Sequence, residues 1–316
     1  GDDAAYISYS TSKHDKILVE PTLNYAQKIG KNDISAVAGY SYDYFHEEYR
    51  GETKLDPLVI GDKYITSFNS ATGTQTCTGS YIEHLLMSYF ARINYSFDDR
   101  YLIQLTGRRD GTSRLPETTR WSSFGSVSLG WRISNEKFFN VNWIDDLKIR
   151  ANLGTLGNTN IGAWDYQATI NTAPRAIMNG DNLVLGMTQS NLTNNDLVWE
   201  RKTTANVGVD FTAMRTRLSA SAEYYYSKSS DLLLALPVLM TTGNEGGAPT
   251  VNAGSLQNTG IEFELGWHDT VGDFSYSVNA NLSTCWNKVL DLGYGQTVYY
   301  TSLAKSEIGK PLGMWY

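Results

Sequence analysis

The chain has 316 residues, of which 41% are hydrophobic, 12% aromatic and 19% charged, and its 28 glycines and 21 tyrosines accompany only seven prolines and two cysteines. This composition excludes a collagenous chain, a disulfide scaffold and a disordered tail, and its charged fraction lies below the roughly 25% of soluble domains, which indicates a non-aqueous neighbour. The net charge of -7 argues against non-specific nucleic-acid binding, which needs a basic stripe.

The amino-terminal segment Gly1-Asp2-Asp3 has neither an initiator Met nor an apolar signal segment, so we expect the chain to be a piece of a longer protein. No segment approaches the roughly 20 apolar residues that a membrane-spanning helix needs. The most apolar run, Leu232 to Met240, is short and contains Pro237. A helical membrane protein is therefore excluded.

Alternation of apolar and polar residues with a period of two recurs along most of the chain and predicts strands with two different faces. In one such run, from Ser88 to Phe97, every odd position is apolar and only Phe90 interrupts the polar even positions. In chain order, the predicted strands are Val19 to Gln27, Ile34 to Tyr44, Ser88 to Phe97, Val127 to Ile133, Leu147 to Gly154, Leu218 to Tyr224, Ile261 to Trp267, and Phe274 to Leu282.

Short and long connections alternate between these strands. The short ones are Gly30 to Asp33, Asp98 to Arg100, Ala213 to Arg217 and Asp269 to Asp273, with a slightly longer link at Asn135 to Asp146. The long ones are Phe45 to Ser80, Asp110 to Arg120, Thr155 to Val198 and Leu233 to Thr259. Short turns at one end and long loops at the other are typical of transmembrane β-barrels. We predict an all-β, antiparallel, up-and-down transmembrane β-barrel that is incomplete, with about ten to twelve strands in an open or partial barrel.

The two faces of the predicted strands differ in a way that suits a bilayer. The apolar face would contact acyl chains, and the polar face would border a water-filled lumen. Aromatic residues flank the short connections, where rings would meet lipid headgroups: Phe97, Tyr101, Phe138, Phe139, Trp143, Phe211, Trp267 and Phe274. Charged residues on the polar face are Arg92, Arg108, Lys148, Arg150, Glu262 and Glu264. The alternative is a soluble, carbohydrate-binding β-sandwich, which has the same period but no reason to gather its long connections at one end.

The sequence contains no catalytic constellation, so we expect no enzyme, cofactor or metal site. A membrane-barrel protease or lipase would need a Ser/His/Asp arrangement, and no serine motif accompanies the histidines. The histidines lack metal-ligand spacing, and the cysteines are far apart in sequence. These residues are His14, His46, His84 and His268, with Cys77 and Cys285.

A cluster of acidic residues around the start of one predicted loop could bind Ca²⁺ through carboxylate oxygens. They lack the spacing of an EF-hand, and a solvated acidic loop explains them better. These residues are Asp43, Glu47, Glu48, Glu52 and Asp56.

The segment Gly107 to Gly111 has the glycines of a phosphate-binding loop, but a strand pattern follows it instead of a helix. We expect a structural role, in which Arg109 and Asp110 form an ion pair that fixes the base of the loop.

The long connection Thr155 to Val198 is rich in aromatic and amide side chains, which stack on sugars or bond to hydroxyl and peptide groups. We predict that it binds an oligosaccharide or peptide ligand through Trp164, Asp165, Tyr166 and Gln167.

Several segments resemble the β-barrel of the SusC/RagA family of TonB-linked outer-membrane transporters from Bacteroidetes. The clearest lies between Asp99 and Phe139 and contains Arg109, Asp110, Gly111, Ser113, Arg114, Trp121 and Trp131. Further similar segments are Leu147 to Asn158, Asn195 to Glu200 with Trp199, Val207 to Phe211, Gly254 to Glu264, and Ile308 to Gly313. Together they cover most of the chain from about Tyr81 onward, and we expect the signature residues, including Trp199 and Glu200, to be structural.

The resemblance implies that residues 1–316 are part of a TonB-dependent receptor β-barrel domain, with the N-terminal plug domain and terminal strands absent. It implies TonB-energised import of glycan or peptide fragments across a Gram-negative outer membrane. The implied partners are a SusD-like surface lipoprotein, TonB acting through the missing plug, and outer-membrane lipid. A TonB-linked receptor for a metal chelate is the alternative within this class.

Overall fold

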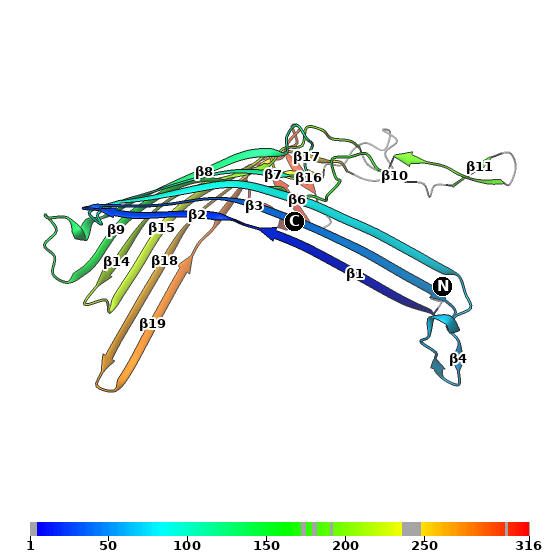
Figure 1. Ribbon diagram of the computed structural model, residues 1–316, viewed down its shortest axis with the longest axis horizontal. Coiled ribbons are helices and arrows are strands. Elements are labelled where there is room, and N and C mark those ends of the chain that lie inside the picture. Colours follow the sequence, from blue (N-terminus) through cyan, green and yellow to red (C-terminus); the bar gives the residue numbers. More distant parts are fainter. Residues whose placement is uncertain are drawn as a thin grey trace. The chain divides into compact units, whose positions relative to one another are not determined.

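The computed structural model describes residues 5–171, 175–178, 182–189, 192–235, 248–300 and 303–315 (Figure 1). The long strands are β1 (Tyr6–Val19), β2 (Thr22–Ile29), β3 (Asn32–Leu55), β6 (Gln75–Phe97), β7 (Tyr101–Thr112), β8 (Trp121–Arg132), β9 (Ile144–Asn158), β14 (Glu200–Ala213), β15 (Leu218–Ser230), β18 (Ser255–Val271), β19 (Phe274–Ser283) and β20 (Trp286–Asp291). The short strands are β4 (Val59–Ile60), β5 (Lys63–Tyr64), β10 (Ile170–Asn171), β11 (Arg175–Met178), β12 (Asn182–Leu185), β13 (Thr188–Gln189), β16 (Leu233–Ala235), β17 (Thr250–Asn252), β21 (Val298–Tyr300), β22 (Ala304–Glu307) and β23 (Met314–Trp315). Two 3-10 turns, η1 (Phe68–Ser70) and η2 (Ile133–Asn135), complete the regular structure. Within the described ranges, no helix has the length and apolar character needed to cross a membrane.

The chain divides into two compact units. Unit 1 contains residues 1–19 and 41–86, and unit 2 contains residues 20–40 and 87–316. The long strands β3 and β6 therefore each contribute residues to both units.

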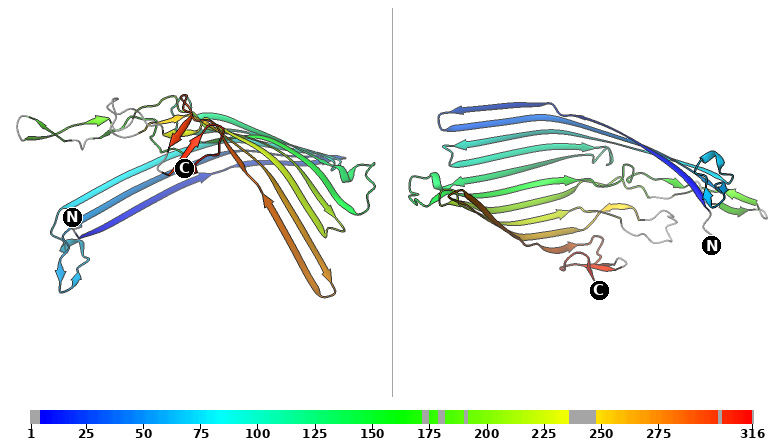
Figure 2. Two further views of the ribbon diagram at one scale, coloured as in Figure 1. Left: turned by 180° about the vertical axis from the view of Figure 1, so that it is seen from behind. Right: turned by 90° about the horizontal axis from the view of Figure 1, so that it is seen from below.

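The main sheet has 12 strands in the order β1-β3-β6-β7-β8-β9-β14-β15-β18-β19, with β2 also paired to β3 and β20 to β18. From β6 onward, each strand of this order pairs with the next long strand along the chain. Within unit 2, the long strands β7, β8, β9, β14, β15, β18 and β19 lie side by side in a single layer, as the right-hand view of Figure 2 shows. In the described residues, the strand order runs from β1 to β19 and does not close on itself. The predicted antiparallel, up-and-down and open architecture is confirmed.

The two faces of unit 2 follow the period-two pattern. The registers pair Val209 with Ala222 and Ala222 with Phe263, so these side chains share one face. Many large apolar side chains on that face are exposed, including Val207, Phe263, Leu265 and Val278. A sandwich would cover this face with a second sheet. Because the layer is single, the sandwich alternative is wrong, and the exposed face has the character of a surface that contacts lipid.

The short connections occur where the sequence predicts them. Gly30 and Lys31 join β2 to β3, and residues 98–100 join β6 to β7. Residues 214–217 join β14 to β15, and Gly272 and Asp273 join β18 to β19. Both Gly30 and Gly272 have positive φ, a conformation that glycine adopts without steric cost. These turns fix the register of their hairpins.

The predicted strand from Val19 to Gln27 is wrong at its start. β1 ends at Val19 and β2 begins at Thr22, and both pair with β3. Pro21 lies between them and has no N–H to donate to the ladder, while its carbonyl accepts a bond from the Tyr40 N–H at 3.2 Å.

The predicted long connection from Phe45 to Ser80 is also wrong in its bounds. β3 continues to Leu55 and β6 begins at Gln75, so that these strands have 24 and 23 residues, more than twice the 9 to 11 of a bilayer crossing. Residues 45–55 are polar at positions of both parities. A strand with water on both faces loses the alternation on which the prediction rests.

Candidate functional site

A network of ion pairs crosses the polar face of β9, β14 and β15. The Asp210 carboxylate lies 2.9 Å from Lys148 Nζ and 3.2 Å from Arg150 Nε. The Arg150 guanidinium also pairs with Glu223, whose other oxygen accepts a 2.6 Å bond from Asn206 Nδ2. Charged and amide groups therefore cover this face, as expected for a surface that borders water inside a barrel.

Arg150 reaches Glu223 across β14 because the residue between them is a glycine. Gly208 is opposite Arg150 on one side and opposite Glu223 on the other. A Cβ at Gly208 would lie 3.0 Å from Arg150 Cζ, so the guanidinium passes directly over this position. The ion pair thus connects β9 to β15 across β14.

The sheet face carries a second charged pair where β7 approaches its long connection. Arg108 Nε donates to both carboxylate oxygens of Asp110 at 2.8 Å, and Arg108 Nη2 donates to Ser88 Oγ at 2.9 Å. The predicted ion pair between Arg109 and Asp110 is therefore wrong, because adjacent strand residues point to opposite faces. Arg109 instead lies over the Trp121 ring, 6.0 Å from its centroid.

The remaining signature residues pack the base of the connection between β7 and β8. A Cβ at Gly111 would lie 2.6 Å from the Trp121 indole, so the ring covers this glycine. Ser113 and Arg114 begin the connection, which contains the fully buried Leu115. Their place in the fold is compatible with the structural role that the resemblance implies.

The outer connections are joined to one another by hydrogen bonds. Trp199 Nε1 donates to the Arg120 carbonyl at 2.9 Å, and Trp199 packs edge-on against Phe124. The Asn252 side chain accepts from the Val198 N–H at 2.8 Å and donates to the carbonyls of Val198 and Asp231 at 2.9 Å. Glu200, the first residue of β14, accepts a 3.4 Å bond from Asn158 Nδ2. The carboxamide of Asn252 was not singled out from the sequence, because its partners are backbone groups of distant segments.

The predicted ligand-binding residues lie together in one turn of the connection between β9 and β14. Trp164 is 39% exposed, and its carbonyl accepts the Gln167 N–H at 2.9 Å. The Asp165 carboxylate accepts the Gly162 N–H at 2.8 Å, and the Tyr166 carbonyl accepts the Asn194 N–H at 3.1 Å. Asp165 therefore has a partner within its own turn, while the Trp164 ring is partly open to solvent.

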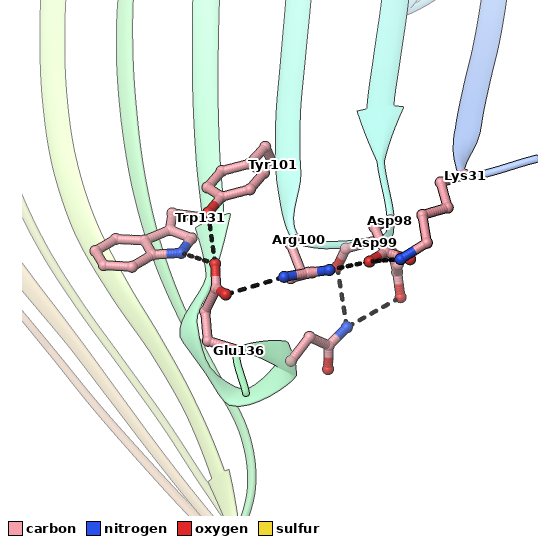
Figure 3. Close-up of polar contacts among 8 residues, drawn as sticks. Lys31, Asp98, Asp99, Arg100, Tyr101, Trp131 and Glu136 are labelled. Carbon is pink, nitrogen blue, oxygen red and sulfur yellow. Dashed lines mark hydrogen bonds and ion pairs between the residues drawn. The ribbon is translucent and has the colours of Figure 1, made fainter. Parts of the chain in front are cut away.

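A polar network that sequence reasoning missed joins the short-turn ends of three hairpins (Figure 3). Glu136 accepts bonds from Tyr101 Oη at 2.7 Å, Trp131 Nε1 at 3.1 Å and Arg100 Nη1 at 3.1 Å. Arg100 also pairs with Asp98, which accepts a 2.8 Å bond from Lys31 Nζ. The signature residue Trp131 thus helps to hold Glu136. We call this set of residues, Lys31, Asp98, Arg100, Tyr101, Trp131 and Glu136, the turn network.

The turn network shifts the ionisation of its acids. The hydrogen bond from Lys31, followed by that from Arg100, lowers the pKa of Asp98. The hydrogen bond from Tyr101, followed by that from Trp131, lowers the pKa of Glu136. Both carboxylates are therefore held in the charged form that the network needs.

Four of the five residues of the predicted acidic loop, Asp43, Glu47, Glu48 and Glu52, lie on strand β3, and Asp56 directly follows it. Asp43 pairs with Lys16 at 3.1 Å, Glu47 lies 3.7 Å from His14 Nδ1, and Glu48 pairs with Arg50. Alternation places Asp43 and Glu47 on the opposite face from Glu48 and Glu52. Across the described ranges, no group of three or more His, Cys, Asp or Glu residues is arranged to hold a metal ion.

Comparison with known proteins gives the family. The sequence pattern of the family described as "TonB dependent receptor-like, beta-barrel" matches residues 3–313. The chain belongs to this family of TonB-dependent receptor barrels. It is an all-β segment of an outer-membrane protein of the SusC/RagA type, as the resemblance predicts, and the family is not one of enzymes.

The curated relatives come from two Bacteroidetes. The chain is 32% identical to TonB-dependent receptor P39 of Formosa agariphila over 90% of its length, and 31% identical to TonB-dependent receptor SusC of Bacteroides thetaiotaomicron over 91%. It spans only 27% and 28% of those two proteins. A solved structure of the RagAB peptide transporter matches 96% of the chain with a TM-score of 0.85 and 25% identity, and 34% of that chain is covered.

Proposed function

We propose that this TonB-dependent receptor barrel segment belongs to an importer that takes glycan or peptide fragments across the outer membrane, energised through TonB. The observation that carries the proposal is the contrast between the two faces of unit 2. One face exposes large apolar side chains, and the other carries the ion-pair network of Lys148, Arg150, Asp210 and Glu223. A membrane sheet with this contrast is suited to enclosing a water-filled path.

The similarity to SusC and to the RagAB peptide transporter supports this substrate class. In this proposal, residues 1–316 form part of the barrel domain, and TonB acts through a plug domain elsewhere in the whole protein. A SusD-like surface lipoprotein covers the outer connections. The hydrogen bonds of Asn252, Trp199 and Thr119 would give such a partner a firm base, because Thr119 also bonds to the Leu197 carbonyl.

The function is tested by deleting the gene for the full-length protein in its natural host. We expect the deletion strain to lose growth on one class of oligosaccharide or peptide, and a strain that lacks TonB to show the same loss. Restoring the gene should restore growth. Unchanged growth of the deletion strain on every glycan and peptide mixture tested, with lost growth on a metal chelate, would replace the proposal by the chelate receptor.

The ligand-binding prediction is tested in the same full-length protein. Trp164→Ala and Tyr166→Ala should each weaken binding of the fragment identified by the growth test about tenfold, because an aromatic ring at the centre of a contact contributes strongly to affinity. Calorimetric titration of the purified receptor measures the effect. Phe138→Ala is the control, since this exposed ring lies beside a short turn at the other end of the strands. Equal affinity of all three variants would remove these residues from the site.

A further inference from the structure

Three arginines and one aspartate lie around Ser122 and Phe124 at the outer end of unit 2. Arg108 and Asp110 lie opposite Phe124 and Ser122, respectively, in the pairing of β7 with β8. Arg120 immediately precedes β8. Its carbonyl accepts the Thr112 N–H at 3.2 Å, which continues the ladder between β7 and β8 by one pair. In the strand alternation, Arg120 has the same parity as Ser122 and Phe124. Alternation therefore places Arg120 on the face that carries Arg108 and Asp110.

Arg201 reaches this cluster from β14. Its Nη2 lies 3.3 Å from Ser122 Oγ, and its Cζ lies 5.7 Å from the centroid of the Phe124 ring. The ring fixes the guanidinium by a cation–π contact and leaves its other donors open. Arg201 therefore contacts the residue of β8 that follows Arg120 by two positions.

The two arginines differ from most others in lacking a carboxylate partner. Arg50, Arg100, Arg108, Arg132, Arg150 and Arg217 each form an ion pair with an acid. In the part of the chain that the structure describes, no acid lies within ion-pair distance of Arg120 or Arg201. The nearby Asp110 is 7% exposed and has both oxygens bound by Arg108.

The Nε atom of Arg120 is buried and, within the described residues, has no hydrogen-bond partner. A buried charged donor without a partner is unfavourable, and an arriving acceptor relieves this cost. The guanidinium is suited to a carboxylate, because its fixed fork matches the two oxygens. This orphaned donor is a second observation that points to an anionic ligand.

From these contacts we infer that Arg120 and Arg201 form a binding site for carboxylate groups of the incoming oligomer. The site deepens the proposed import function and rests on it. It lies at the long-connection end of the strands, which faces outward in outer-membrane barrels. An acidic oligosaccharide and an acidic peptide both supply the required chemistry, and the test separates them.

The test uses the purified full-length receptor and four probes. Tetragalacturonate and tetraglutamate supply carboxylates, and maltotetraose and tetra-alanine are their uncharged counterparts. We expect one of the two anionic probes to bind at least about tenfold more tightly than its counterpart at low salt, and the preference to shrink at high salt. The probe that binds identifies the source of the carboxylates.

Arg120→Gln and Arg201→Gln should each weaken binding of that anionic probe about tenfold, because each removes a charge-assisted contact. Arg201→Lys keeps the charge and should restore most of the binding, which separates loss of charge from loss of folding. Arg215→Gln is the matched control, because Arg215 is an exposed arginine of the short turn 214–217 and has no ion pair in the described ranges. It should bind as the unmodified receptor does.

The outcomes are separable. The inference is overturned when neither anionic probe is preferred, or when Arg201→Gln binds the preferred probe as tightly as Arg215→Gln does. Import of an uncharged fragment in the growth test would then leave the proposed function standing. Failure of the growth test would remove both.

Discussion

Single glycines decide where large side chains lie on this sheet. The Trp121 ring covers Gly111, the Phe124 ring covers Gly157, and the Arg150 guanidinium covers Gly208. In each case the glycine lies on a neighbouring strand, where any Cβ would occupy the space of the ring or guanidinium. An extended residue without a side chain weakens a strand, so the covering group also compensates for the missing packing.

Gly157 gives the sharpest prediction of this kind. A Cβ there would overlap the Phe124 ring, which is 6% exposed and fixed by edge-on contact with Trp199. Because the ring must move out of its packed position to admit the added Cβ, we expect Gly157→Ala to lower the free energy of unfolding by about 1–3 kcal/mol. Urea unfolding of the full-length protein in detergent measures the change.

Gly107→Ala is the matched control for this experiment. Gly107 is also a strand glycine, in β7, but no heavy atom lies within 4 Å of its added Cβ. Its substitution should leave the unfolding midpoint unchanged or raise it slightly. The same loss of stability in both variants would contradict the role assigned to the Phe124 ring.

The sequence identified the signature residues but not all of their contacts. Arg109, Asp110, Gly111 and Trp121 could be recognised as a group, yet the acid pairs with Arg108. Alternation along the strand would predict the pair of Arg108 with Asp110, since residues two positions apart in a strand have side chains on the same face. The orphaned Arg120 donor could not be predicted, because it depends on burial by packed segments.

Among the elements, the short turns are tied together by charge. The turn network joins the β2–β3 turn, the β6–β7 turn and the η2 link through Lys31, Asp98, Arg100 and Glu136. These four charged residues belong to connections, so the sequence showed only scattered charges near turns. Their meeting follows from strand order, which brings the turns of neighbouring hairpins to one edge.

The turn network predicts a loss of stability in acid. The pKa of Asp98 and that of Glu136 are lower in the folded protein than their ordinary values of 3.8 and 4.5. Such groups stabilise the fold fully above those ordinary values, and the contribution disappears as the pH falls through the lowered ones. We therefore expect the urea concentration at the unfolding midpoint of the full-length protein to decrease when the pH falls below about 4.

Glu136→Gln and Asp98→Asn should each reduce this acid dependence, because the amide side chain carries no negative charge that protonation could remove. Asp62→Asn provides the comparison, since Asp62 lies in the exposed turn between β4 and β5 of unit 1. Unfolding midpoints measured from pH 3 to pH 7 distinguish the variants. Parallel curves for Glu136→Gln and the unmodified protein would exclude a stabilising role for the Glu136 charge.

The strands that the sequence predicted best are those whose two faces lie in different environments. Strands β8, β9, β15, β18 and β19 have one apolar and one polar face, and the period-two pattern located them. The ends of β3 and β6 in unit 1 are polar on both faces, and the pattern failed there. Part of the connection that follows β15 lies outside the described residues, so its predicted extent from Leu233 to Thr259 is only partly tested.

For the molecule as a whole, the main consequence of the fold is the difference between its two surfaces in unit 2. Val278 and Asn279 are adjacent in the middle of β19 and point to opposite faces, and Val278 is 62% exposed. Val278→Lys should therefore cost roughly 2–4 kcal/mol on insertion into a bilayer, the cost of a lysine near the midplane on the lipid face.

Asn279→Lys places the same charge on the polar face and should cost far less. Folding of the full-length protein into phosphatidylcholine vesicles, followed in urea, measures both variants. A larger loss for Asn279→Lys than for Val278→Lys would reverse the assignment of the two faces. It would also remove the observation on which the import proposal is based.

Fold class and family were accessible from the sequence because they depend on patterns repeated over many strands. The ligand was not, because it depends on a few side chains in connections of irregular structure. Trp164 and Tyr166 were singled out by composition alone. Arg120 and Arg201 are 81 positions apart in the numbering, and only the folded chain brings Arg201 to Ser122, two residues from Arg120.

The strand order also sets the sequence of events when the chain folds. From β6 to β19, each long strand pairs with the long strand that precedes it in the chain, so pairing can advance from one neighbour to the next. The bonds of Asn252 to Val198 and Asp231 are different, because they need β14, β15 and β18 already in register. We expect the hydrogen bonds of Asn252 to form last, after the strands that they connect have paired.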